Sequence, residues 1–163
     1  MLIGVLALQG AVSEHCAALD SLNISNKEVR NTEDIRDIDG LIMPGGESTT
    51  LRKLLVNANL WDFIMKSDMP IMGTCAGAIL LGKSDDITFE KMDYIIDRNY
   101  YGRQIDSFEE VLEIEDYPDF RGVFIRAPAI TDIGKTRVIA YCKGCLLYTS
   151  PSPRDATLSR MPS

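Results

Sequence analysis

The sequence predicts an α/β fold with a doubly wound, mostly parallel sheet flanked by helices. Three observations support this fold class. Short apolar runs, of which residues 2–8 are the first, have the composition of strands buried on both faces. In the first half of the chain, these runs alternate with segments of helical spacing. A strand–turn–helix sequence around Cys75 has the form of a nucleophile elbow, in which a sharp turn exposes one reactive side chain.

The first half of the chain supplies the alternating elements of this sheet. Pro44-Gly45-Gly46 forms a turn that exposes backbone N–H groups, and we expect Ser48, Thr49 and Thr50 to cap the helix that follows. The predicted elements are, in order, a strand at 2–8, a helix at 11–21, a turn at 23–26, a short strand near Val29, a strand at 41–43 and a helix with an apolar face at Leu51, Leu54 and Leu55.

The elbow and a run of short strands complete the predicted elements. These are a strand at 70–74, a helix at 76–83, and short strands at 94–96, 111–114, 123–125 and 138–140. Ligands of doubly wound sheets bind at the carboxyl ends of the strands. We therefore expect Gly45-Gly46 and Cys75, which both follow strands, to face one crevice.

Cys75 is the candidate nucleophile. Gly73 and Gly77 flank it in a G-x-C-x-G pattern, and glycine allows a tight turn without a Cβ clash. A thiol at a helix N-terminus is favoured as the thiolate, which suits acyl chemistry. A lone cysteine is more often a small buried hydrophobe, but the two glycines favour the nucleophile here. A Cys nucleophile also needs a base, and the chain contains one His, His15.

Composition excludes several classes of function. The net charge of −7 argues against a nucleic-acid surface, and no apolar run approaches the ~20 residues of a membrane span. Gly45-Gly46 lacks the lysine of a phosphate-binding P-loop. The four cysteines form no disulfide framework, which predicts a cytoplasmic protein. Cys142 and Cys145 have C-x-x-C spacing but supply only two ligands, so we expect no metal site.

The C-terminal residues depart from this pattern. From about Cys145 the chain is rich in Ser, Pro and Arg and has neither helical nor strand periodicity. One interpretation is a disordered C-terminus. The other, which we favour, is a non-native tail resembling translated adaptor or vector sequence. We therefore expect an incomplete domain over 1–144, lacking its last strand and helix, and a disordered tail over 145–163.

Several motifs together identify a family. They are Gly4–Val12 with Glu14-His15, Pro44–Thr50, Gly73–Gly77, Arg98-Asn99 with Gly102–Glu109, and Phe124–Pro128. In this order they resemble the glutaminase subunit of pyridoxal 5′-phosphate synthase, in the class I glutamine amidotransferase superfamily. The resemblance covers residues 1 to about 144 and implies the three-layer, flavodoxin-like arrangement of that superfamily.

The resemblance implies an activity and a partner. The enzyme would hydrolyse L-glutamine to L-glutamate and ammonia without a cofactor. The ammonia would pass to the synthase subunit, which makes pyridoxal 5′-phosphate (vitamin B6). Cys75 matches the nucleophile of the family. The residues that match its glutamine-binding positions are Gly46, Glu47, Ser48, Arg98, Ile125 and Arg126. The N–H groups of Gly46 and Ala76 are candidates for the oxyanion hole.

The family pattern stops before its general base. Family members carry a late His-Pro-Glu segment, and no His follows His15 in this chain. We therefore expect impaired glutaminase activity in the chain as written. His15 is a possible substitute base, although a structural or partner-facing role fits better. One alternative is a non-catalytic module that docks to the synthase subunit. Another is an amidotransferase that serves a different acceptor, such as an imidazole or purine precursor.

Overall fold

The computed structural model describes residues 1–98, 108–114, 120–124, 128–142 and 145–149. It contains two compact units, Met1–Leu81 and the described residues from Gly82 onward. The sequence prediction places residues 1–144 in a single domain, so this division adds a boundary that no linker composition signals. Each unit is described by itself.

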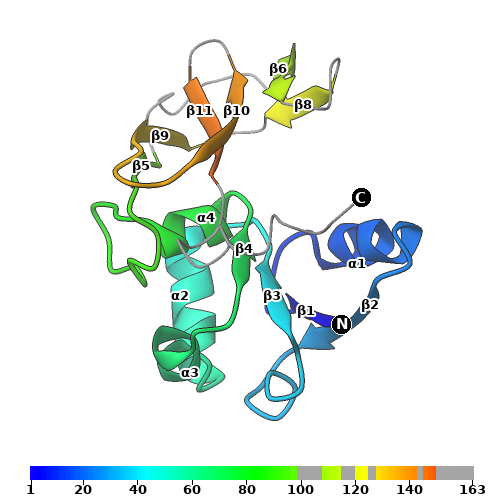
Figure 1. The fold of residues 1–163 in the computed structure, drawn as a ribbon. Coiled ribbons are helices and arrows are strands. Elements are labelled where there is room, and N and C mark those ends of the chain that lie inside the picture. Colours follow the sequence, from blue (N-terminus) through cyan, green and yellow to red (C-terminus); the bar gives the residue numbers. More distant parts are fainter. Residues whose placement is uncertain (99–107, 115–119, 125–127, 143–144, 150–163) are drawn as a thin grey trace. The chain divides into compact units, whose positions relative to one another are not determined.

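The first unit contains the predicted parallel sheet (Figure 1). Its strands are β1 (Leu2–Leu6), β2 (Ser25–Val29), β3 (Gly40–Met43) and β4 (Ile71–Gly73), in the order β2-β1-β3-β4. The pairs of neighbouring strands are all parallel. All residues of β3 are buried, as expected for a central strand covered on both faces. The predicted α/β class is therefore confirmed.

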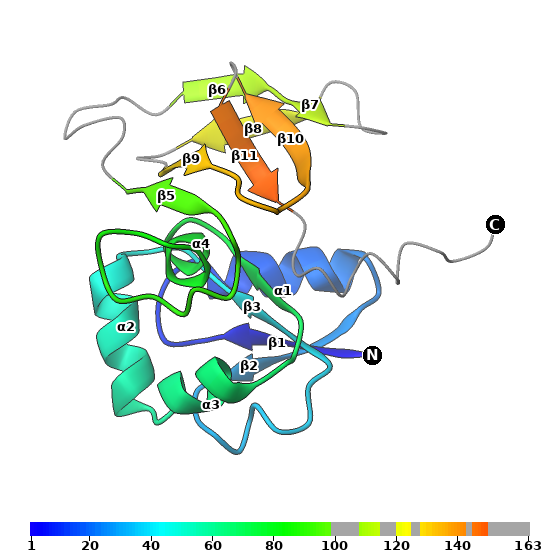
Figure 2. The same cartoon turned by 60° about the vertical axis from the view of Figure 1, so that its left-hand side comes forward.

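Four helices accompany this sheet in the first unit: α1 (Val12–Ser21), α2 (Ser48–Asn57), α3 (Trp61–Lys66) and α4 (Ala76–Leu81). Figures 1 and 2 show α1 on one side of the sheet and α2 and α3 on the other. Right-handed crossovers produce this arrangement, because the chain moves in opposite directions from β1 to β2 and from β3 to β4. The fully buried core side chains include Val5, Leu6, Val29, Met43, Leu51, Leu55 and Ile64.

Helix α3 was not predicted. It has six residues and buries only Ile64 among them, so its sequence carries too little apolar periodicity to indicate a helix. Helices α1 and α4 begin and end within two residues of the predicted ranges 11–21 and 76–83, and α2 contains the predicted Leu51, Leu54 and Leu55. No helix of the described residues is long and apolar enough to cross a membrane.

The second unit is built of short strands, as the sequence predicts, but they pair antiparallel. They are β5 (Ile95–Asp97), β6 (Phe108–Val111), β7 (Glu113–Ile114), β8 (Arg121–Phe124), β9 (Ala129–Asp132), β10 (Val138–Cys142) and β11 (Cys145–Thr149). One sheet has the order β5-β9-β11-β10-β7, while β6 and β8 form a separate ladder. Strands β9 and β11 were not predicted from the sequence.

Strand β11 lies in the segment predicted to be a disordered tail. Its backbone pairs antiparallel with β10, with Cys142 opposite Cys145, and with β9 at Leu146 and Ile130. The expectation of disorder from residue 145 is therefore not met for 145–149. Tyr148 and Thr149 favour strands, and this preference was overlooked beside the Ser- and Pro-rich residues that follow. The rest of the predicted tail, 150–163, lies outside the described residues.

Candidate active site

The nucleophile elbow has the geometry that the sequence predicts. Strand β4 ends at Gly73, α4 begins at Ala76, and Cys75 lies in the turn between them with an exposed side chain. Its φ of +50° is in the left-handed region, which costs a non-glycine residue roughly 1–2 kcal/mol. Such conformations persist only where the surroundings enforce them, and they cluster at functional sites.

Glycine is required on both sides of Cys75 for space. A Cβ on Gly77 would lie 2.1 Å from the carbonyl oxygen of Met43, and a Cβ on Gly73 would lie 2.5 Å from the carbonyl carbon of Gly77. Both distances are far shorter than any van der Waals contact. The helix therefore packs directly on the backbone of β3, and the elbow accepts no side chain at either position.

The loop after β3 lies against Cys75. A Cβ placed on Gly45 would be 3.1 Å from the Cβ of Cys75 and 3.8 Å from its Sγ. Gly46 has a φ of +127°, which L side chains rarely adopt. The side chain of Gln9 supports this loop, since its Nε2 donates to the carbonyl oxygen of Glu47 at 2.9 Å. The loop at 45–46 and Cys75 thus lie together at the carboxyl ends of β3 and β4.

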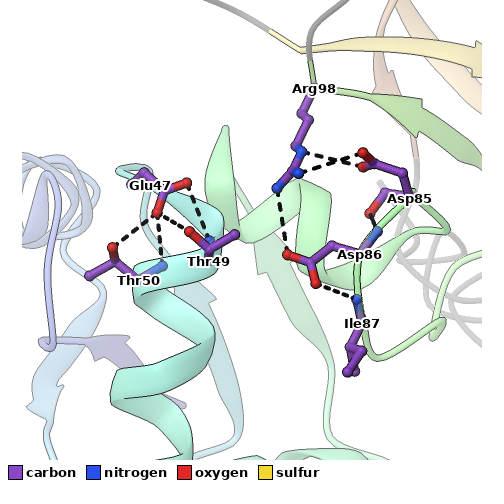
Figure 3. A network of polar contacts seen from close by, with 8 residues as sticks. Glu47, Thr49, Thr50, Asp85, Asp86, Ile87 and Arg98 are labelled. Carbon is purple, nitrogen blue, oxygen red and sulfur yellow. Dashed lines mark hydrogen bonds and ion pairs between the residues drawn. The ribbon is translucent and has the colours of Figure 1, made fainter.

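Glu47 is the N-cap of α2, which corrects the prediction that residues 48–50 cap this helix. Its carboxylate accepts hydrogen bonds from the backbone N–H groups of Thr49 and Thr50 and from both threonine hydroxyls (Figure 3). Ser48 is instead the first helical residue and is buried. The extended backbone of Glu47 lets its longer side chain reach back over the first turn.

These hydrogen bonds set the protonation state of Glu47. The hydroxyl of Thr49 and the backbone N–H of Thr50 are the leading causes that lower the pKa of Glu47 from 4.5 to about 2. The carboxylate is therefore ionised at neutral pH and holds no proton to donate. This excludes Glu47 as a general acid at neutral pH and makes its side chain a support for the loop and helix.

Replacing Glu47 by Ala is expected to destabilise the fold by about 1 kcal/mol at pH 7, the usual cost of a lost N-cap. A carboxylate whose pKa is depressed on folding contributes stability above its unfolded pKa of about 4.5, and this contribution is lost as the pH falls toward about 2. Urea unfolding of the wild type and E47A should therefore converge as the pH falls through this window. E47Q keeps one acceptor oxygen, so its free energy of unfolding at pH 7 should lie between those of the wild type and E47A. A stability difference between the wild type and E47A that does not change with pH would contradict this role of the Glu47 carboxylate.

His15 approaches the elbow from α1. Its Nε2 lies 3.1 Å from Oγ1 of Thr74, the residue before Cys75. Burial lowers the pKa of His15, while the neighbouring Glu14 acts in the opposite direction. The imidazole is therefore neutral at neutral pH, and one of its nitrogens is engaged by the hydroxyl of Thr74.

Arg98 belongs to the second unit and forms ion pairs there. Its Nε lies 3.3 Å from Oδ1 of Asp85, and its Nη1 lies 3.5 Å from Oδ2 of Asp86. Figure 3 marks both ion pairs with dashed lines. The other carboxylate oxygen of Asp86 accepts the N–H of Ile87 at 2.7 Å, which fixes this carboxylate. The predicted glutamine-binding residues Ile125 and Arg126 lie outside the described residues.

The cysteines differ in exposure. Cys16 is half-buried beside Val5, Leu19 and Ile42, and burial raises the pKa of its thiol. Cys75 is exposed. The side chains of Cys142 and Cys145 lie outside the described part of the structure. Among the residues whose placement is described, no group of three or more His, Cys, Asp or Glu side chains is arranged to hold a metal ion.

Sequence reasoning assigned no role to two residues that support this site, Gln9 and Thr74. Gln9 follows the first predicted strand, and Thr74 occupies a variable position of the G-x-C-x-G pattern. Polar residues directly after buried strands were the available signal, because such residues lie at the edge where ligands bind. Their partners Glu47 and His15 are distant in sequence, so only the fold reveals the contacts.

Comparison with known proteins gives one family. Residues 5–146 match the SNO glutamine amidotransferase family. The chain is 48% identical over 136 residues to the pyridoxal 5′-phosphate synthase subunit PdxT of Methanocaldococcus jannaschii, covering 82% of this chain and 73% of that protein. It is 41% identical over 152 residues to the protein of the same name from Actinobacillus pleuropneumoniae, covering 90% and 80% respectively.

Solved structures agree with this match. The crystal structure of a glutamine amidotransferase superposes with a TM-score of 0.83 at 39% identity, covering 91% of this chain and 84% of the other. The structure of PurLQS from Thermotoga maritima has a TM-score of 0.63 at 15% identity, covering 96% of this chain and 89% of the other. At that identity the second likeness concerns the fold alone.

Proposed function

This chain belongs to the SNO glutamine amidotransferase family, and from this we propose that it hydrolyses L-glutamine to L-glutamate and ammonia for pyridoxal 5′-phosphate synthesis. The observation that carries the proposal is Cys75, an exposed thiol at a φ of +50° in a turn whose flanking glycines accept no side chain. Relatives with 48% and 47% identity carry the name of a pyridoxal 5′-phosphate synthase subunit, which indicates the acceptor system.

Cys75 acts as the nucleophile in two steps. Its thiolate attacks the side-chain carboxamide carbon of glutamine, and the tetrahedral intermediate collapses with cleavage of the C–N bond. The leaving nitrogen takes a proton and departs as ammonia, which leaves a glutamyl thioester on Sγ. Water then hydrolyses the thioester to glutamate and returns the thiol.

The backbone around Cys75 supplies the oxyanion hole in this proposal. The N–H groups of Gly46 and Ala76 are the proposed donors, each worth about 3–4 kcal/mol in the transition state. The position of Gly45 supports this assignment, because a Cβ placed there would lie 3.8 Å from Sγ of Cys75, so the loop that contains Gly46 is next to the thiol. The φ of +127° at Gly46 gives this loop a backbone path that other residues rarely adopt.

The remaining glutamine contacts are assigned residue by residue. Glu47 and Ser48 open α2 beside the loop, and both Glu47 oxygens are engaged by threonines. We therefore assign the glutamine contact of Glu47 to its backbone. Arg98, which forms ion pairs with Asp85 and Asp86 in its own unit, is assigned to the carboxylate of glutamine from the family resemblance. Ile125 and Arg126 are assigned from the family resemblance.

The partner in this proposal is the synthase subunit, which would accept the ammonia from the glutaminase. We further propose a cytoplasmic location, since Cys16 and Cys75 are both free thiols. Hydrolysis through a cysteine thioester needs no cofactor or metal, so none is assigned.

Ammonia release from L-glutamine tests this function. Residues 1–163 contain one His, and its Nε2 is hydrogen-bonded to the hydroxyl of Thr74. The proposed reaction therefore has no evident general base in this stretch. We expect hydrolysis several orders of magnitude slower than with a complete triad, since removing one member of a Ser-His-Asp triad costs on the order of 10⁴ or more. Added imidazole should supply a base and raise the rate. No release at any imidazole concentration, with the synthase subunit present, would reject hydrolysis by this chain.

Residues 1–163 contain a single His, which is hydrogen-bonded to Thr74, and this favours a second candidate, a non-catalytic module that docks to the synthase subunit. Such a module would bind the synthase subunit in sedimentation velocity and release no ammonia with imidazole. An amidotransferase that serves another acceptor would release ammonia and fail to bind that subunit. The same pair of measurements therefore separates all three functions.

A further inference from the structure

The side chain of His15 joins the first helix to the residue before the nucleophile. His15 Nε2 and Thr74 Oγ1 are 3.1 Å apart, and the two residues are 59 positions apart in the sequence. His15 lies in α1, which packs on β1 and β2, whereas Thr74 follows β4 at the other end of the strand order β2-β1-β3-β4. Both side chains are half-buried. This hydrogen bond therefore connects α1 to the turn after β4 at the carboxyl edge of the sheet.

Thr74 is fixed at three points. Its N–H donates to the carbonyl oxygen of Met43 at 3.0 Å, and its own carbonyl oxygen accepts the N–H of Gly77 at 3.0 Å. The hydroxyl makes the third contact, to His15. The next residue is Cys75, whose left-handed backbone needs such restraint, because a strained conformation relaxes when its supports are removed.

We propose that His15 is a positioning residue of the nucleophile elbow, which acts through Thr74 to keep the thiol of Cys75 presented to substrate. The inference rests on the proposed function for its chemistry and on the hydrogen bond for its geometry. His15 does not touch the substrate in this role. A neutral imidazole offers one donor and one acceptor, so either tautomer maintains the bond to a hydroxyl that also donates and accepts.

Two features separate this role from simple packing and from proton transfer. Packing depends on the volume of the imidazole, whereas positioning depends on a polar atom within reach of Thr74 Oγ1. Proton transfer would require a group that titrates near neutral pH, whereas positioning requires only a hydrogen bond. Gln places an amide nitrogen or oxygen near the location of Nε2 and does not titrate. His15→Gln should therefore restore the function, and His15→Leu should not.

The test is the rate of alkylation of Cys75 by iodoacetamide at pH 8, read by peptide mass spectrometry, with Cys16 followed in the same sample. We expect H15L and T74V each to slow Cys75 alkylation about fivefold, the equivalent of one hydrogen bond of about 1 kcal/mol. The double variant should be no slower than either single variant, because both substitutions remove the same bond. H15Q and T74S should return the rate to within about twofold of the wild type.

Three results would overturn the proposal. Additive effects of H15L and T74V would mean that the residues act independently. If Cys75 alkylation is slowed in H15Q but unchanged in T74V, His15 acts through proton transfer or charge and not through its hydrogen bond to Thr74. A rise in Cys16 alkylation in step with the fall at Cys75 would indicate general loosening of α1. Alkylation by iodoacetamide does not depend on a glutamine site. The coupling between His15 and Thr74 can therefore be observed even if Cys75 proves not to bind or hydrolyse glutamine. In that case only the proposed function would be rejected.

Discussion

Replacing Cys75 by Ser is expected to abolish the ammonia release from L-glutamine that added imidazole restores. A cysteine is partly ionised near neutral pH and is intrinsically nucleophilic, whereas a serine hydroxyl depends on a neighbouring base. Free imidazole in solution is not held beside residue 75, so it does not replace the positioned base that a serine hydroxyl needs. The C75S variant should therefore release ammonia no faster than a sample without protein.

Cys16→Ser is the matched control for this substitution. Cys16 is half-buried beside Val5, Leu19 and Ile42, and burial raises the pKa of its thiol. C16S should therefore retain the imidazole-dependent rate. Equal losses in both variants would indicate damage to the fold, and an unaffected C75S would remove Cys75 from the reaction.

Replacing Gly77 by Ala is expected to have the largest effect on stability. The added Cβ would lie 2.1 Å from the carbonyl oxygen of Met43, which is backbone and cannot rotate away. Overpacking of this kind costs about 3 kcal/mol, and the melting temperature should fall by roughly 10 °C in a chain of this size. The same carbonyl accepts the N–H of Thr74, so its displacement should also slow the alkylation of Cys75.

Gly40→Ala is the control for this prediction. A Cβ at Gly40 would lie 3.3 Å from Cδ1 of Ile3, the far end of a flexible side chain that can yield. G40A should keep the wild-type alkylation rate and remain within about 1 kcal/mol of wild-type stability. If G77A unfolds at the wild-type temperature, the close packing of α4 on the backbone of β3 is contradicted.

The parallel half of the fold was predictable because its signals are local. Residues 2–8 and 41–43 are apolar runs bounded by turn residues, and strands occupy Leu2–Leu6 and Gly40–Met43. The G-x-C-x-G pattern likewise placed Cys75 in a turn, because the steric demand for glycine is a property of the elbow itself. Such features depend on neighbours within a few residues.

The unpredicted features depend on contacts between distant residues or on weak local preference. Strand β11 was overlooked because Ser- and Pro-rich residues follow it, and its pairing with β10 and β9 is tertiary. The cap of α2 was assigned to Ser48–Thr50 because Ser and Thr are favoured caps, yet Glu47 occupies the position. The hydrogen bond between His15 and Thr74 spans 59 positions, and no pattern in the sequence indicates it.

The most direct test of Cys75 as the glutaminase nucleophile is covalent labelling by 6-diazo-5-oxo-L-norleucine, an electrophilic analogue of glutamine. The diazo carbon next to the ketone takes the proton of the thiol, the sulfur then attacks that carbon, N₂ departs, and a stable thioether remains. Peptide mass spectrometry should find a single adduct on Cys75, and excess L-glutamine should slow its formation. Labelling of Cys16 at an equal rate, or labelling of Cys75 that glutamine does not slow, would contradict a glutamine site at this elbow.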